Sequence, residues 1–175
     1  MGVLGLALLS SLVLSWQADR RLQDNFLRQG ERITTSLARQ SRLALIYRNA
    51  DNAAEAIKST LAFPDISGVR LLAPDMQMVT SQGEGFTNIP APALPSTSPE
   101  KIQNAFLETE DASAWYFFSP VLSDSAAQDS PFEMQARKDE LLGYVRVAQS
   151  KATLRKMSRD IFLLNLMISL GFALA

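Results

Sequence analysis

The sequence predicts a small α+β domain that is built on an antiparallel sheet and bracketed by two transmembrane helices. The chain has 175 residues, which is enough for one compact core. No charged residue occurs in residues 1–16 or 161–175, so all the charges lie between two apolar ends. Within the charged region, helical periodicity precedes and follows several stretches of alternating apolar and polar residues, which are typical of strands.

The two uncharged ends predict membrane spans. Leu, Val, Ala and Gly dominate the first run, and Trp16 stands where an interfacial aromatic residue would anchor it. We expect truncated transmembrane helices at residues 1–18 and 159–175, with an extracytoplasmic domain at residues 19–158. A cleaved signal peptide is the alternative for the first run, but that run lacks a basic n-region. Charge alone does not fix the orientation, because the intervening segment exceeds the roughly 60 residues over which the positive-inside rule is counted.

Helical periodicity begins the extracytoplasmic region and runs over residues 17–47. Its apolar positions share one narrow stripe, namely Leu22, Phe26, Ile33, Leu37 and Ala44. Such a stripe suits a partner helix or the domain's own sheet, and we expect both, with dimerisation nearer the membrane. A second helix is expected at residues 52–61, because Asn49 and Asp51 are good capping residues before it.

Strand signals follow the second helix. Residues 68–72 and 77–80 predict a hairpin, with Pro74 at the second position of the turn between them. Residues 82–99 hold four of the eight prolines and predict an irregular loop, and residues 99–107 a short helix or turn.

Two further segments, residues 114–122 and 141–148, predict central antiparallel strands, because they are rich in aromatic and β-branched residues. The polar residues 123–140 between them predict a long excursion, and a helix from Ala152 leads into the second span. This order fits a PAS-like antiparallel sheet with a long N-terminal helix.

Composition excludes several classes of function. With 17 basic and 18 acidic residues, the chain has no excess positive charge for nucleic acid. It has neither cysteine nor histidine, which removes the commonest metal ligands and the commonest general base. We therefore expect no catalytic residue, metal site or cofactor in this segment. Glu108, Glu110 and Asp111 lie close together, but their spacing matches no calcium loop, and we interpret them as solvated acids.

Two arginines are candidates for ligand binding. Arg70 and Arg146 each lie in an apolar strand, and the alternation places each on the face opposite its apolar neighbours. A guanidinium can hold a carboxylate with two parallel hydrogen bonds, and Tyr116 or Tyr144 could add a hydroxyl group. The sequence thus predicts an anion site formed by these four residues. The alternative is that both arginines simply project into solvent.

Two stretches carry a resemblance to a known family. The first is residues 48–57, which lead through residues 64–69 to Pro74 and Asp75, and the second is residues 141–147. Together with the order of elements, they resemble the N-terminal periplasmic sensor region of BarA/GacS-type hybrid sensor histidine kinases, over nearly the whole chain. The first stretch is also similar to the periplasmic domains of membrane diguanylate cyclases.

The resemblance implies a homodimer in the bacterial inner membrane, with the sensor domain in the periplasm. It implies an input region that transmits a small-molecule or protein signal to cytoplasmic autophosphorylation and phosphotransfer. The parent kinase would use ATP and Mg and would pass the phosphoryl group to a downstream response regulator. The alternatives are the input domain of a diguanylate cyclase or phosphodiesterase, and that of a non-enzymatic chemoreceptor.

Overall fold

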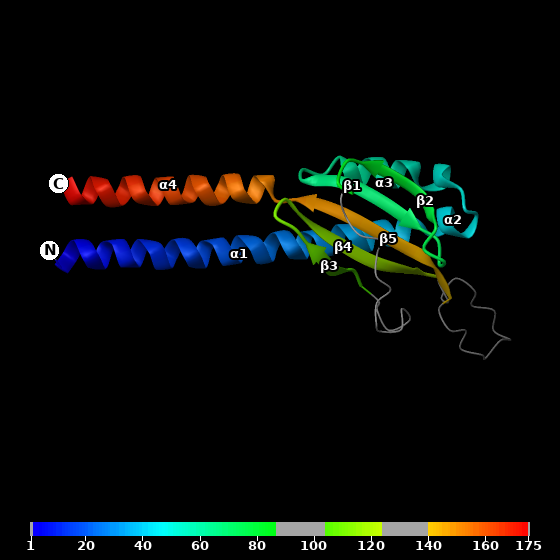
Figure 1. Ribbon diagram of the computed structural model, residues 1–175, viewed down its shortest axis with the longest axis horizontal. Helices are drawn as coiled ribbons and strands as arrows, with labels where there is room; N and C mark the ends of the chain where they lie inside the picture. Colours follow the sequence, from blue (N-terminus) through cyan, green and yellow to red (C-terminus); the bar gives the residue numbers. More distant parts are fainter. Residues whose placement is uncertain (1, 87–103, 124–139, 175) are drawn as a thin grey trace, which may run out of the picture. The chain divides into compact units, whose positions relative to one another are not determined.

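The described parts of the chain form one five-stranded antiparallel sheet with helices. The computed structural model describes residues 2–86, 104–123 and 140–174. These fall into two units, a larger one over residues 30–150 and a smaller one formed by residues 1–29 and 151–175. The sheet lies in the larger unit, with the strand order β2-β1-β5-β4-β3 (Figure 1). The predicted α+β class with an antiparallel sheet is confirmed.

The strands are β1 (Ile66–Leu72), β2 (Met78–Gly83), β3 (Phe106–Glu110), β4 (Ala114–Leu122) and β5 (Leu141–Ser150). Strand β5 is central and pairs with β1 on one side and with β4 on the other. Strands β2 and β3 are the edges of the sheet. Because side chains alternate between the two faces of a strand, Val145 and Val147 lie on one face of β5, and Tyr144 and Arg146 lie on the other.

The structure corrects two predicted segments. Phe106 and Leu107 begin strand β3, so the helix or turn expected through Leu107 is wrong there. Strand β2 continues to Gly83, beyond the predicted end at Thr80. Strand β3 has only five residues, two of them Glu, and its pairing with β4 supplies what its local sequence does not signal. The rest of the expected loop and turn, residues 87–103, and most of the predicted polar excursion, residues 124–139, lie outside the described residues.

The helices are α1 (Gly2–Gln40), α2 (Arg42–Ile46), the 3-10 helix η1 (Ala50–Ala53), α3 (Ala54–Leu61) and α4 (Ala152–Leu174). The helical pattern that reaches residue 47 in the sequence is interrupted at Ser41, where α1 gives way to α2. The predicted cap at Asn49 is confirmed for η1, because the Asn49 side chain accepts a hydrogen bond of 2.9 Å from the backbone N–H of Asp51. The helix expected at residues 52–61 begins instead at Ala54, and its N-cap residue, Ala53, makes no side-chain hydrogen bond.

The main core lies between one face of the sheet and the helices. From the helices it takes Ile33, Leu37, Ala44, Leu45 and Ile57, and from the sheet Val69, Leu71, Val145 and Val147. The C-terminal part of the predicted apolar stripe therefore covers the domain's own sheet. Gly30 allows α1 to approach closely, because a Cβ atom at this position would overlap the ring of Phe117 and the side-chain amide of Gln149.

Within residues 2–86, 104–123 and 140–174, no helix is both long enough and apolar enough to cross a membrane. The spans expected at residues 1–18 and 159–175 stay predictions.

Candidate anion-binding site on the sheet

Arg70 and Arg146 lie side by side on the sheet face that the helices leave uncovered. They are direct Cα partners in the pairing of β1 with β5. The apolar neighbours of each arginine belong to the core cluster on the helix side, namely Val69, Leu71, Val145 and Val147. The two guanidinium groups thus share the opposite face, as the alternation of the two strands predicts.

Arg146 is a buried charge with a carboxylate partner. Its side chain is 1% exposed, and its Nε donates a hydrogen bond of 2.7 Å to Oε2 of Glu108, which is 12% exposed. A guanidinium removed from water requires such a partner. Burial raises the pKa of the Glu108 carboxyl group, and this effect outweighs the opposing influence of Arg146.

Glu108 reaches Arg146 from an edge strand. Leu107 is opposite Phe117 and Thr109 is opposite Tyr116, so the register of β3 is irregular at Glu108. An irregularity of this kind redirects a side chain out of the regular alternation. Here the Glu108 carboxylate extends past β4 to the arginine on β5.

Arg70 is the more open of the two arginines. Its Nε donates a long hydrogen bond of 3.4 Å to Oγ of Ser81, and its Cζ lies 4.5 Å from the centroid of the Phe86 ring. Burial first, and then repulsion from Arg146, lower the pKa of Arg70, although arginine keeps its charge. Within the part of the chain that the structure describes, no carboxylate pairs with Arg70, so its terminal nitrogens remain available as donors.

Phe86 packs against the sheet beside the two arginines, in a cluster with Tyr116 and Ala148. Its ring centroid is 5.9 Å from Cζ of Arg146 and 6.1 Å from the centroid of the Tyr116 ring. The absence of a side chain at Gly68 makes room for it, since a Cβ atom there would lie 2.9 Å from Cε2 of Phe86. The aromatic faces of Phe86 and Tyr116 therefore flank the guanidinium groups and favour their positive charge.

Tyr116 presents its ring to the site, while its hydroxyl group faces a turn. The hydroxyl donates a hydrogen bond of 2.9 Å to Oδ2 of Asp111. Burial, and then the hydrogen bond and charge of Asp111, raise the pKa of Tyr116 to about 12. Asp111 also accepts hydrogen bonds from Ser113 and Ala114, and these, led by the Ser113 side chain, lower its pKa to about 2. Asp111 thus organises the turn between β3 and β4.

Tyr144 shares the sheet face but belongs to a neighbouring cluster. Its Cα partners are Leu72 on β1 and Pro120 on β4, one step along the sheet from the arginines. Its ring lies 4.9 Å from that of Phe118, and burial raises the pKa of its hydroxyl group. Of the four predicted residues, the structure therefore gathers Arg70, Arg146 and Tyr116 around Phe86 and places Tyr144 beside them.

The sequence prediction missed Glu108 and Phe86. The interpretation of Glu108 as a solvated acid is wrong, because it is bonded to Arg146 and largely buried. Its neighbours also have partners: Glu110 accepts a hydrogen bond of 2.9 Å from Nε1 of Trp115, and Asp111 holds the turn. The position of Glu108 directly after the apolar residues Phe106 and Leu107 was the available signal for it, whereas Phe86 lies in a segment that was interpreted as an irregular loop.

No protein-family model matches this chain, and no curated protein matches its sequence.

The arrangement of Arg70 and Arg146 beside two aromatic rings indicates what kind of ligand the site is suited to bind. Guanidinium groups with flanking aromatic rings are suited to hold a planar anion. Across residues 2–86, 104–123 and 140–174, no cluster of three or more acidic side chains is placed to hold a metal ion. The arrangement provides binding through charge and hydrogen bonds.

Proposed function

We propose that this chain is the signal-sensing, membrane-anchored input region of a bacterial two-component sensor histidine kinase. In this proposal the sheet is a PAS-like periplasmic sensor, residues 1–18 and 159–175 anchor a homodimer in the inner membrane, and a cytoplasmic kinase uses ATP and Mg to phosphorylate a response regulator. The observation that carries the proposal is the position of Arg146 on β5, the strand that leads directly into α4.

Strand β5 carries part of the candidate site and is followed directly in the chain by helix α4. It ends at Ser150, and α4 begins at Ala152. Arg146 lies only a few residues before that junction, so a ligand that contacts it acts on the strand continuous with α4. A ligand biases two conformations only when it binds them with different affinities. We propose that the two conformations, with and without ligand, differ in the position of β5.

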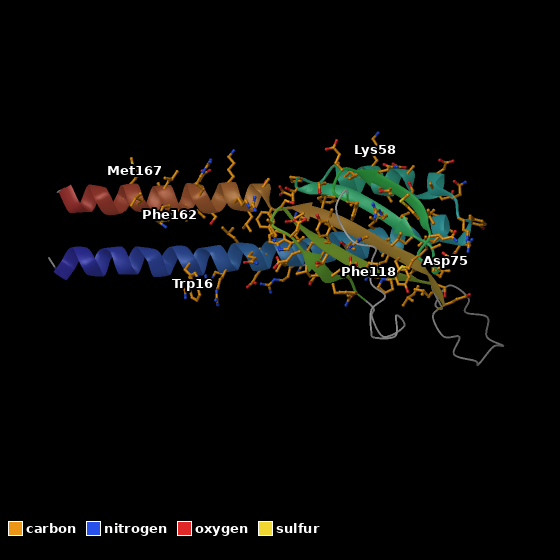
Figure 2. The ribbon with its side chains drawn as sticks, viewed as in Figure 1. Trp16, Lys58, Asp75, Phe118, Phe162 and Met167 are labelled. Atoms are coloured by element: carbon orange, nitrogen blue, oxygen red, sulfur yellow. The ribbon has the colours of Figure 1, made fainter. Side chains whose placement is uncertain are left out.

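The exposed apolar side chains of α4 support the membrane anchor. Large apolar side chains that are between 44% and 71% exposed follow one another on this helix, namely Phe162, Leu163, Leu164, Leu166, Met167 and Ile168. Figure 2 shows Phe162 and Met167 standing out from α4. A continuous exposed apolar surface of this kind is characteristic of a segment that contacts lipid or another helix.

Two other classes of parent protein remain alternatives. A diguanylate cyclase or phosphodiesterase, or a non-enzymatic chemoreceptor, would use the same sensor and the same helices with another output. The sequence that follows Ala175 in the parent decides between them, because a dimerisation helix with a phosphoacceptor histidine is specific to the kinase.

The absence of cysteine in the chain allows a direct test of topology. Lys58 is exposed on α3 and projects outward from the domain (Figure 2). A Lys58→Cys variant should react with a membrane-impermeant maleimide in intact spheroplasts, and the unaltered chain should not react. Reaction only after lysis would place the domain in the cytoplasm and refute the proposal.

A helix-phase experiment tests the input role. Residues 1–175 would be joined to the dimerisation and catalytic segments of a histidine kinase, and phosphotransfer would be measured. One residue inserted after Lys156 rotates the following helix by about 100°, whereas seven residues add nearly two full turns. We expect the single insertion to change kinase output and the seven-residue insertion to restore it. Unchanged output with both insertions would contradict transmission through α4.

A further inference from the structure

The geometry points to a carboxylate-binding site with a built-in competitor: Glu108 occupies, on Arg146, the position that the carboxylate of a small ligand takes in the bound state. This inference deepens the proposed function. Its signalling consequence rests on that function, whereas the binding itself does not.

The two partners of the ion pair are anchored very differently. Arg146 stands on the central strand β5, which is paired on both sides, and its side chain is 1% exposed. Glu108 stands on the five-residue edge strand β3, which pairs only with β4 and is irregular at that residue. Withdrawal of Arg146 would disrupt the core of the sheet. Withdrawal of Glu108 disturbs only an edge, so Glu108 is the displaceable partner.

The group already bound to Arg146 identifies the chemistry of the ligand. A carboxylate oxygen lies 2.7 Å from Nε of Arg146 in a setting that excludes most water. The carboxylate of a ligand presents the same planar pair of oxygens. The buried guanidinium is paired with a carboxylate both before and after the exchange, so neither state carries the penalty for an uncompensated buried charge.

Arg70 gives the ligand an interaction that Glu108 lacks. It is the direct neighbour of Arg146 on the adjacent strand, and in the described parts of the chain its terminal nitrogens have no carboxylate partner. Glu108 is tethered to β3, whereas the carboxylate of a free ligand can shift from the Glu108 position toward β1, where the charge of Arg70 adds to that of Arg146. The Phe86 ring lies 4.5 Å from Cζ of Arg70 and the Tyr116 ring lies 5.8 Å from Cζ of Arg146, which favours a short ligand with a small apolar group.

Burial also weakens the hold of the site on Glu108. The raised pKa of Glu108 means that Arg146 does not fully compensate the loss of hydration of its carboxylate. The ionised Glu108 carboxylate is thus bound to Arg146 but is not fully stabilised there. An external carboxylate can therefore replace it.

Chemical rescue tests the inference with the full 175-residue chain in mild detergent. Glu108→Ala removes the internal carboxylate and leaves space beside Arg146. We expect its melting temperature to fall, and sodium acetate to restore more of the loss than sodium chloride at equal ionic strength. Glu55→Ala, at an exposed position of α3, is the matched control and should respond equally to both salts. Equal effects of acetate and chloride on Glu108→Ala would overturn the inference.

A second variant provides a test that does not depend on the folding of Glu108→Ala. Glu108→Gln keeps the shape of the side chain and removes its charge. By calorimetry, acetate should bind this variant about tenfold more tightly than the unaltered chain, and Arg70→Gln should reverse the gain. Equal affinity in the two proteins, or indifference to Arg70→Gln, would refute the inference. If acetate bound as expected but the Lys58→Cys variant did not react with the maleimide in intact spheroplasts, only the proposed function would be refuted.

Discussion

Gly30→Ala sets two opposing effects against each other where α1 meets the sheet. In an exposed helix, replacement of glycine by alanine stabilises by about 1 kcal/mol. At Gly30, however, the new methyl group overlaps the Phe117 ring, which is fully buried on β4, and the amide of Gln149, which is 1% exposed. Overpacking of this kind costs about 1–3 kcal/mol. We therefore expect a net destabilisation of up to about 2 kcal/mol, which lowers the melting temperature by up to roughly 8 °C.

Denaturant unfolding, followed by the fluorescence of the buried Trp115, measures this effect. Phe117→Leu removes part of the obstructing ring, so Gly30→Ala should cost less in that background, and a double-mutant cycle should show the coupling. Ser36→Ala, at an exposed position of the same helix, is the control and should change stability by no more than about 0.5 kcal/mol. If Gly30→Ala stabilised the protein by the amount that helix propensity alone requires, the proposed contact with Phe117 would be wrong.

Three further predictions concern buried polar groups and pH. Gln149→Met should stabilise the domain by about 1–3 kcal/mol, because among the described residues neither side-chain amide atom of Gln149 has a hydrogen-bond partner; a lower denaturant midpoint would contradict this. Asp111 has a folded pKa of about 2, below its ordinary value of 3.8, so its stabilising effect is present above that ordinary value and is lost as the pH falls toward 2. The stability difference between Asp111→Asn and the unaltered chain should therefore shrink over that range, and a constant difference would exclude this role. Glu108 has a folded pKa above its ordinary 4.5, so its contribution is present below that value and is lost as the pH rises through the folded pKa. Melting curves should thus show Glu108→Gln gaining stability relative to the unaltered chain as the pH rises, and the opposite trend would refute the direction of the shift.

Local patterns in the sequence were sufficient to predict the central strands and to predict that the two arginines lie on the same face of the sheet. Period-two alternation around Arg70 and Arg146 places both on one face, whatever the register between β1 and β5. The same alternation separates them from Val145 and Val147, which the structure buries against the helices. The Asn49 cap was also predictable, because capping depends on residues only two or three positions apart.

Features that depend on contacts between residues far apart in the sequence could not be predicted from local patterns. The bond between Glu108 and Arg146 joins residues 38 positions apart, and it depends on a register irregularity that no local pattern signals. Strand β3 is defined by its pairing with β4, and its own five residues are not typical of a strand. Phe86 follows a glycine-rich segment, so its position across the sheet depends on the small residues beneath it, such as Gly68, and not on its neighbours in the chain.

The unequal anchoring of the ion pair also has a kinetic consequence. Amide hydrogen exchange usually shows that edge strands open locally at a free energy well below that of global unfolding. Opening of β3 would release Glu108 while β1, β5 and the core beneath them stay closed. Exchange of the internal carboxylate for an external one would then be limited by this local opening and not by diffusion of the ligand. The lifetime of the occupied state would be set by an edge strand of five residues.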